Sequence, residues 1–565
     1  MAIAAEQNHL MPIHTFANGT AYMERGSYVF IGPLKMRDED ACVQCFLTAL
    51  EQNDSDYLYA LRYEPVKQDC EAWFEAQWQN VEEKLVNTVY VWNKHTCHMQ
   101  VKSIYKHPLC PACVEDDVCT HDDTEDLQHT LPFHDGRTKN VLHIMEQMEQ
   151  MENVLLDADT GIGKRLFRDV ESSLIPMYGI QSYMGSSPYH SYGRSSSLIT
   201  SKMAAKLEMI ERFASMVPYF KQDIRASYDD LLAQGKEVID PTTFALEGGT
   251  YTQLHYTYDP TKAYYWTSCF HWRDEQAVLL PEQFVYYDNQ LLHQEERFLY
   301  ETSNGTALGG TLQEAIIYGV FEALERDHFL LHWYTQKLPR RIDVTSIKDD
   351  RIHGILCLLA AHQFEMYLFD ITLEVGIPTV WVLARSQSEH HHIHLYNAAG
   401  SNYDPEKAIF SGLVEVVTSI FVYDKLYANK EEELAAWIGN PQRVVSMEDH
   451  IKYYALKENA GAFDFLFNHI QQCQWITTEE MKPSFEFDYE QIKQRVYEYH
   501  PDIYVANMSN QITKQMGLYV AKVFIPSLQP ITFGVQNERI NWERLSQYGG
   551  AAFIPYQHLQ PHPFP

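Results

Sequence analysis

The sequence predicts an α+β protein in which a small cysteine-bearing domain with an acidic linker (residues 1–135) precedes a large domain (residues 136–565). Three observations lead to this expectation. The chain has 565 residues, too many for one ordinary core, so the larger domain can enclose an internal site. Two Cys-x-x-Cys pairs lie near the N-terminus, and two glutamate-rich helical segments each follow a loop containing Gly and Ser.

Composition narrows the class of protein. Apolar residues make up 45% of the chain, and no segment has the roughly 20 uninterrupted apolar residues that span a bilayer. Residues 1–8 lack the basic start and apolar core of a secretion signal, so we expect a cytoplasmic protein without a membrane partner. Acidic residues outnumber basic ones 76 to 44, and the net charge of −32 argues against nucleic acid as a partner.

The two Cys-x-x-Cys pairs predict a metal site. Cys42 and Cys45 form one pair, and Cys110 and Cys113 form the other, with Pro111 between the second two thiols. Each pair is half of a tetrahedral zinc site, and four thiolates leave the ion no open position, so the site would be structural. Two alternatives stay open: unrelated buried cysteines, since Cys70, Cys97 and Cys119 lie nearby, or replacement of one ligand by Cys119 or His107.

The segment after the cysteines predicts a domain boundary. Residues 115–126 are acidic with little apolar content, which is typical of a solvated linker. Apolar residues then recur at helical spacing from Val141 to Leu155, and their methionines are expected in the core. Gly161 ends that helix. Four histidines at 390–394 follow a strand-like segment, 377–383, and are expected in a surface loop.

The first glutamate-rich helix follows residues 192–197 and carries Glu208, Glu211 and Arg212. Residues three and four apart share one face of a helix, so these side chains should project together. The plain alternative is an ordinary surface ion pair between Glu208 and Arg212.

The second helix follows residues 303–311, a loop that includes Asn304, and carries Glu314, Glu322, Glu325 and Arg326. At about 100° per residue, Glu322 lies about 80° and Glu325 about 20° around the helix from Glu314. The apolar residues of 316–324 fill the adjoining arc, so the carboxylates border the core, where cations such as Mg²⁺ with a nucleotide would relieve their repulsion. Alternatively, Thr311 and Glu314 form a capping box.

Several motifs occur together in a known order. Residues 302–328, with Glu322, Glu325 and Arg326, resemble the signature helix of the YcaO family, and residues 193–212 resemble its earlier ATP motif. Residues 518–534 and the alternating prolines of 561–565 are similar to the branch of that family that forms azolines, thiazoles and oxazoles. The resemblance covers about 155–565 and implies a YcaO-type domain with mixed sheets and ATP-binding helices.

The N-terminal part has its own resemblance. Residues 29–45 and 107–113 look like the zinc-bearing end of the ThiF-like partner domain often joined to YcaO proteins. The residues before Cys42 are too few for the leader-binding module that such partners carry. We therefore expect a separate ThiF-like leader-binding partner, and the resemblance further implies a flavin-dependent azoline dehydrogenase. A homodimer stays open.

The family resemblance implies an ATP-dependent cyclodehydration of Cys, Ser or Thr in a ribosomal precursor peptide, with ATP, Mg²⁺ and a structural Zn²⁺ as its cofactors. The end products would be bacteriocin- or thiopeptide-type natural products. By residue matches, the carboxylate of Pro565 would accept a proton in catalysis. The residues implied to hold ATP and Mg²⁺ are Arg194, Glu208, Glu211, Arg212, Asn304, Glu314, Glu322, Glu325, Arg326 and Glu415.

Three positions depart from the family pattern. Ala204 stands where Ser is common, Gly310 where some members have Asn or Gln, and Ser411, four residues before Glu415, where Arg is common. If that Arg orients phosphate, its absence weakens nucleotide binding, and the alternative is a non-catalytic scaffold or peptide-binding subunit. Thioamide or amidine formation is disfavoured by the proline-rich end.

Overall fold

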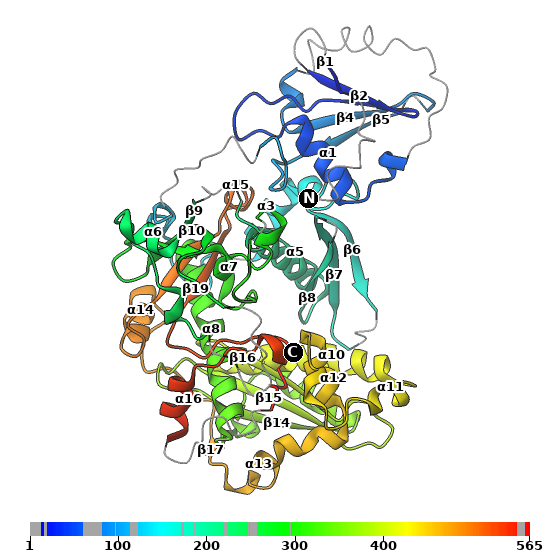
Figure 1. Cartoon of the computed structure of the whole chain (residues 1–565). Coiled ribbons are helices and arrows are strands. Elements are labelled where there is room, and N and C mark those ends of the chain that lie inside the picture. The colour runs from blue at the N-terminus through cyan, green and yellow to red at the C-terminus, as the bar shows by residue number, and fades with distance from the viewer. Residues whose placement is uncertain are drawn as a thin grey trace.

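The computed structural model describes residues 13–15, 20–59, 82–96, 98–113, 123–139, 141–170, 174–185, 187–219, 224–246, 248, 257–293, 295–550 and 560–564. Within these residues the chain forms four sheets with helices packed against them, so the predicted α+β class is confirmed (Figure 1). No described helix combines the length and apolar character needed to cross a membrane.

The N-terminal domain is an antiparallel sheet with one long helix beside it. Its strands, in spatial order, are β1 (Ile13–Thr15), β2 (Ala21–Arg25), β3 (Tyr28–Ile31), β4 (Thr88–Asn93) and β5 (His98–Ser103). Helix α1 (Val43–Gln52) packs Phe46 and Leu50 into the same core as Phe30. Short 3₁₀ turns lie at Asp56–Tyr59 and Glu82–Leu85. The two segments that carry the four cysteines adjoin this domain's core.

The expected solvated linker is wrong for its second half. A 3₁₀ turn at Glu125–Gln128 buries Leu127 in the core around helix α8 (Leu312–Thr335). Asp126 accepts a hydrogen bond from Asn507 at 2.6 Å and pairs with Lys514 at 2.8 Å. One buried leucine and the paired Asp126 carboxylate are enough to dock an otherwise polar segment. Residues 114–122, including Cys119, lie outside the described residues, as do Cys70 and Cys97.

The predicted helix at 141–155 is confirmed as α3 (Val141–Gln150) and α4 (Glu152–Leu155), and Met148 and Leu155 are buried in the core. A turn follows, and its Asp157 and Asp159 carboxylates pair with Lys102 of β5 at 2.7 and 2.9 Å. The N-terminal sheet is thus tied to the large domain immediately before the large domain's first strand.

That strand belongs to a three-stranded sheet of β6 (Gly163–Asp169), β7 (Met177–Met184) and β8 (Ser187–Arg194). Helix α5 (Leu198–Ser215) packs on β7 and β8. Gly193 permits this contact, because a Cβ there would lie 1.9 Å from the Ser201 carbonyl oxygen and 2.2 Å from the Ala205 nitrogen. The helix predicted before Arg212 is present, whereas the loop expected at 192–197 is shorter, because β8 continues to Arg194.

A six-stranded sheet comes next. Its order is β11 (Ala277–Pro281), β10 (Ala263–His271), β18 (Tyr504–Asn507), β19 (Tyr519–Phe524) and β12 (Thr306–Gly309), with β9 (Ile224–Ser227) also paired to β10. Its smaller helices are α6 (Tyr228–Ala233), α7 (Glu282–Val285), α14 (Tyr489–Tyr497) and α15 (Gln511–Gln515), with 3₁₀ turns at Pro241–Thr243 and Asn289–Leu291.

The remaining sheet has the order β16 (Leu395–Ser401), β15 (Thr379–Ser386), β14 (Phe364–Asp370), β13 (Arg340–Ile342) and β17 (Trp475–Ile476), and only β13 and β17 pair in parallel among the described strands. The helices around it are α9 (Asp350–Ala361), α10 (Pro405–Tyr427), α11 (Glu431–Ala435), α12 (Met447–Ala455), α13 (Asp464–Phe467) and α16 (Trp542–Gly549). 3₁₀ turns lie at Val344–Ser346, Pro441–Arg443, Lys457–Phe463, Ile470–Gln472 and Val535–Asn537. The histidines of 390–394 lie in the loop between β15 and β16, where His391 stacks on Phe364.

Helix α8 joins the six-stranded sheet to the five-stranded sheet of the large domain (Figure 1). Its first turns pack with Val523 of β19, and its later turns pack Phe329 against Trp381 of β15. The helix is therefore buried along most of its 24 residues. Charged side chains in its middle are consequently held against other elements and cannot all face bulk water.

Candidate functional site

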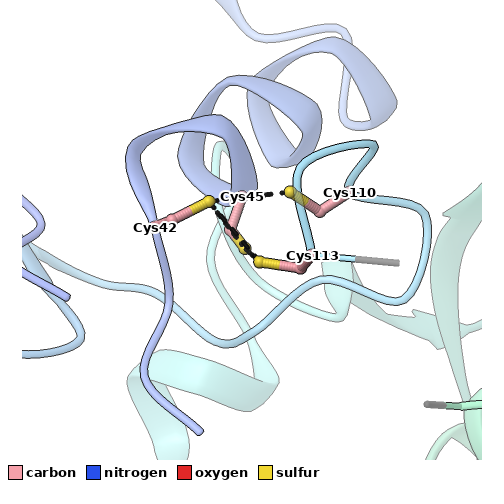
Figure 2. A group of neighbouring side chains, drawn as sticks. All are labelled: Cys42, Cys45, Cys110 and Cys113. Carbon is pink, nitrogen blue, oxygen red and sulfur yellow. Dashed lines mark hydrogen bonds between the residues drawn. The ribbon is translucent and has the colours of Figure 1, made fainter. Parts of the chain in front are cut away.

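The four cysteines form one compact group, called the tetrathiolate site below (Figure 2). The Sγ atom of Cys42 lies 3.7 Å from those of Cys45 and Cys110 and 3.6 Å from that of Cys113, and the Cys45 and Cys113 Sγ atoms are 3.6 Å apart. Four sulfurs at about 2.3 Å from one zinc ion in a tetrahedron would be about 3.8 Å apart. The observed spacing fits this geometry.

The backbone presents these thiols. Cys45 lies in the first turn of α1, and the turn at 107–113 is closed by hydrogen bonds from Cys110 N to His107 O and from Cys113 N to Cys110 O, both 3.0 Å. The His107 backbone N–H donates to Cys45 Sγ at 3.4 Å, and its ring Nδ1 accepts from Leu109 N. Burial lowers the pKa of His107 to about 3. The structure thus places His107 beside the site, where four thiols already complete a tetrahedron.

The carboxylate site, defined as Glu208, Glu211, Glu322 and Glu325, lies between α5 and α8. On α5, Glu208 pairs with Arg212 at 2.9 Å, so the ion pair considered as an alternative is present. Glu208 also accepts a hydrogen bond from the backbone N–H of Tyr192 at the end of β8, at 3.2 Å. That second contact directs the Glu208 carboxylate toward β8.

On α8, Glu322 and Glu325 flank one arginine. Arg326 approaches Glu322 at 3.5 Å and Glu325 at 3.6 Å. Both distances exceed those of a close hydrogen-bonded pair, so the arginine neutralises the two carboxylates only in part. Of the arc predicted for Glu314, Glu322 and Glu325, the structure brings Glu322 and Glu325 together around this arginine.

The carboxylates of the two helices repel one another. Burial, followed by the charges of Glu322 and Glu208, raises the pKa of Glu211 to about 8. Burial, with Glu322 and Glu415 opposing the effect of Arg326, raises the pKa of Glu325 to about 7, and burial also raises the pKa of Glu322. Carboxyls in this state release their protons readily only if a cation arrives, and hard carboxylate oxygens suit Mg²⁺. These residues fit a metal–nucleotide group.

Backbone groups outside α5 and α8 lie close to these carboxylates and favour their ionised form. Leu308 in β12 lowers the pKa of Glu211, Gly305 lowers that of Glu322, and Ser401 at the end of β16 lowers that of Glu325, each against the larger effect of burial. Contacts of this kind cannot be predicted from sequence, because every residue carries the same backbone groups.

The tetrathiolate and carboxylate sites differ in spacing. The ligand atoms of the four cysteines all lie within 4.8 Å of one another. Among the described residues, no other group of three or more metal-ligating side chains is this compact. The carboxylate site is wider, as expected where metal ions would be shared with substrate phosphates.

Glu314 makes different contacts from the other glutamates of α8. Its buried carboxylate accepts hydrogen bonds from Arg137 at 3.1 Å, from the N–H and the hydroxyl of Thr138, and from Gly310 N at 3.1 Å. Thr311 caps the helix by accepting from Glu314 N, so the capping alternative is half present: the return bond reaches Gly310 instead of Thr311. Because four protein donors already use this carboxylate, its contacts favour a structural role.

Three other predicted residues border the site. Arg194 ends β8 half-buried, close enough to Tyr396 and Tyr423 to influence the pKa of both hydroxyls. The Oδ1 of Asn304 is buried without a hydrogen-bond partner. Glu415 lies on α10 and adds to the charge around Glu325.

The three departures lie on the same elements. Ala204 is half-buried on α5, and Gly310 precedes α8, where a Cβ would lie 2.6 Å from the Thr138 hydroxyl. Ser411 is exposed on α10, so that position provides no cation beside Glu415.

The segment 560–564 reaches the carboxylate site. Phe564 is buried, and the Arg326 guanidinium lies 4.1 Å from the centre of its ring. Tyr454 donates to Pro561 O, and His450 donates from Nδ1 to His562 O, each at 2.5 Å. Pro565 lies outside the described residues, so its predicted role as a proton acceptor stays a prediction.

Sequence reasoning missed one side chain, Lys522 on β19. It is 1% exposed and lies near Glu322, whose pKa it lowers. A signal was available: Lys522 is the single charged residue in the otherwise apolar segment 518–526, and a buried strand seldom carries an ammonium group without a partner.

Comparison with known proteins places the chain. The model of the YcaO family, described as a YcaO cyclodehydratase that binds ATP and Mg²⁺, matches residues 192–529. An uncharacterised protein of Methanothermobacter thermautotrophicus is 21% identical over 351 residues, which is 62% of this chain and 83% of that protein.

Solved structures agree in fold. A heterocyclase in complex with substrate and cofactor covers 90% of this chain and 72% of its own, with a TM-score of 0.69 at 19% identity. The heterocyclase TruD covers 93% and 71%, with 0.61 at 18% identity. YcaO from Methanopyrus kandleri, bound with AMPPCP and Mg²⁺, covers 70% and 92%, with 0.51 at 14% identity. Since the family model spans more than half of the chain and includes both helices of the carboxylate site, the chain belongs to the YcaO cyclodehydratase family.

Proposed function

We propose that this chain catalyses ATP- and Mg²⁺-dependent cyclodehydration of Cys, Ser or Thr residues in a ribosomal precursor peptide, giving thiazoline or oxazoline rings. The observation that carries the proposal is the group of crowded carboxylates on α5 and α8, Glu211, Glu322 and Glu325, whose pKa values are raised by burial. Such a group is costly for an acidic chain unless it binds cations. It lies within the matched family segment.

The residues of the proposed site have two roles: some would bind Mg²⁺ or phosphate, and others orient those ligands. Mg²⁺ would be held by Glu208, Glu211, Glu322 and Glu325, and the nearby charge of Glu415 acts on Glu325. Arg194 and Arg326 would face phosphate oxygens. Bound Mg²⁺ would neutralise the negative charge of the phosphoryl group during its transfer. A YcaO protein bound with AMPPCP and Mg²⁺ has this fold, which supports the assignment. Arg212 fixes Glu208, and Asn304 offers an unpaired amide oxygen at the edge of the site.

The proposed reaction balances in atoms. The side-chain sulfur or oxygen of the peptide attacks the carbon of the preceding carbonyl, and its proton goes to a base. The carbonyl oxygen takes the γ-phosphoryl group of ATP, leaving ADP. The amide nitrogen then loses its proton, the C=N bond forms and inorganic phosphate departs with the carbonyl oxygen. The protein contributes position and charge rather than covalent chemistry.

Four accessory proposals accompany the reaction. The base could be the carboxylate of Pro565, and the approach of Phe564 to Arg326 supports it, because this brings the preceding residue to the edge of the carboxylate site. We further propose a structural Zn²⁺ in the tetrathiolate site, a ThiF-like partner that binds the leader of the precursor, and a flavin-dependent dehydrogenase that oxidises the rings.

Peptide-dependent ATP turnover tests the function. The substrate is a Cys/Ser/Thr-rich precursor encoded beside this gene, added with the leader-binding partner, and the products are phosphate and a peptide lighter by one water per ring. The exposed Ser411, which supplies no cation, favours the alternative of a non-catalytic scaffold. A scaffold would bind peptide with no turnover, and Glu322→Gln would then change nothing.

A further inference from the structure

A buried lysine lies behind the carboxylate site. Lys522 is in the middle of β19, paired in register with Thr306 of β12, and is 1% exposed. Its Nζ donates to the carbonyl oxygens of Thr302 at 2.7 Å and Phe284 at 2.8 Å. Burying an ammonium costs several kcal/mol before compensation. The two carbonyl acceptors offset part of that cost. The contacts that the lysine makes are therefore the reason to look for a role.

Lys522 holds the loop at 301–305 through the Thr302 carbonyl, and other contacts fix the same loop. The Glu301 carboxylate pairs with Arg539 at 3.0 Å, and both side chains are more than nine-tenths buried. Gly305 has a φ of +77°, and a Cβ there would lie 2.6 Å from the Val523 carbonyl oxygen. Its own carbonyl accepts from Val523 N at 2.9 Å. The loop is therefore anchored at its start, middle and end.

The anchored loop faces the carboxylate site. The backbone of Gly305 lies close enough to Glu322 to lower the pKa of its carboxyl, and Asn304, next to it, has a buried Oδ1 without a partner. Asn304, Lys522, Glu301 and Arg539 line one cavity with Ala323 of α8. Its volume of about 60 Å³ leaves room for about two waters. A shift of the loop would move the Gly305 backbone relative to Glu322 and open this cavity.

We propose that Lys522 is a positioning residue of the metal–nucleotide site: by holding Thr302 it sets the Gly305 backbone and Asn304, and through them the carboxylate of Glu322. The proposal rests on the proposed role of Glu322 as a holder of Mg²⁺. Lys522 touches neither metal nor nucleotide. Outer contacts of this kind orient first ligands, and their loss commonly weakens metal affinity 10- to 100-fold.

The test is binding of AMPPCP with Mg²⁺ to the full chain by titration calorimetry, with a melting curve for each variant. Lys522→Met should raise the Kd at least about tenfold. Lys522→Arg, which keeps a charged donor, should restore part of the affinity. Lys94→Met is the matched control, because Lys94 is also buried and ion-paired, to Glu24 in the N-terminal domain. It should bind as the wild type does.

A folded Lys522→Met protein with wild-type Kd would overturn the proposal. If Lys522→Met gives no cooperative melt, Arg539→Gln cuts the other side-chain anchor of the loop and should also raise the Kd, and unchanged binding there would overturn it equally. Glu322→Gln separates the two levels. Normal binding by Glu322→Gln refutes the metal site itself, whereas weak binding by Glu322→Gln with normal binding by Lys522→Met refutes the positioning role alone.

Discussion

The tetrathiolate and carboxylate sites are assembled in a similar way but differ in the spacing of their ligand atoms. Both gather four acidic groups from two segments distant in sequence. The sulfurs converge to 3.6–3.7 Å from Cys42 and can satisfy one ion by themselves. The carboxylates stay farther apart and rely on Arg326, Arg212 and backbone groups of β12 and β16 to limit their repulsion.

The difference concerns what completes each site. A closed tetrahedron needs only the metal and stabilises the fold. An open array of carboxylates is incomplete without a ligand, so it lowers stability and retains binding capacity. The variants below separate these two behaviours.

The largest expected effect is at the tetrathiolate site. Cys110→Ser with Cys113→Ser should remove about one zinc per chain and leave the N-terminal domain open to proteolysis, since structural zinc contributes about 10–16 kcal/mol of apparent binding free energy. Metal analysis and limited proteolysis measure this. Cys357→Ser, an exposed cysteine on α9, is the control. Zinc retained by the double variant, or absent from the wild type, would contradict a tetrathiolate zinc.

The carboxylate site should respond in the reverse direction. Glu325→Gln should reduce peptide-dependent ATP turnover by about 100-fold or more. Without ligand it should also stabilise the fold, by roughly 3 kcal/mol at most, because the pKa of Glu325 is raised to about 7. The gain should be complete above about pH 7 and vanish below about pH 4.5, where both folded and unfolded carboxyls are protonated.

Glu314→Gln is the matched comparison on the same helix. Its carboxylate already accepts from Arg137, Thr138 and Gly310, so the change should lower stability by about 2 kcal/mol. If Glu325→Gln and Glu314→Gln both destabilise, the distinction between an incomplete site and a structural carboxylate is wrong.

The tail segment should give a smaller, pH-dependent effect. His450 and His562 stack with ring centres 4.1 Å apart, and burial lowers the pKa of His450 to about 4. Burial and the charges of His450 and Arg326 keep the pKa of His562 well below its usual range. The unfolded chain binds these protons first, so stability should fall as the pH falls from about 6.5 toward 4. Melting temperatures across this range should fall less steeply for His450→Gln, and identical slopes would rule out this linkage.

The smallest effect concerns the link between the two regions. Lys102→Met removes ion pairs to Asp157 and Asp159 that join the N-terminal sheet to the turn before β6. We expect a loss of about 1–2 kcal/mol in the free energy of unfolding, with unchanged nucleotide affinity. Weaker AMPPCP binding in this variant would mean that the two sites are coupled through the turn.

The sequence predicted the tetrathiolate site well, because Cys-x-x-Cys spacing is local chemistry that a turn or a helix start can present directly. It also predicted the helices of the carboxylate site, since glutamates at helical spacing border an apolar face. What it could not predict was how the two helices meet. Glu211 and Glu322 come together only because Gly193 lets α5 approach β8 and because α8 lies between two sheets.

Other misses have a common physical origin. Local composition around 115–126 favours a solvated linker, yet Leu127 and Asp126 find long-range partners on α8, Asn507 and Lys514. Glu314 looked equivalent to Glu322 by spacing, but Arg137 and Thr138 donate to the Glu314 carboxylate near the start of α8. Tertiary contacts, which no spacing encodes, decide both cases.

The central claim is that the amide oxygen of the peptide becomes an oxygen of the released phosphate. The most direct measurement uses a precursor peptide with oxygen-18 in the carbonyl that precedes the cyclised residue, incubated with the full chain, its leader-binding partner, ATP and Mg²⁺. The account predicts one labelled phosphate per ring, a peptide lighter by one labelled water, and neither product with Glu322→Gln. Ring formation with the label retained in the peptide or released as water, or phosphate that carries oxygen only from ATP and solvent, would contradict it.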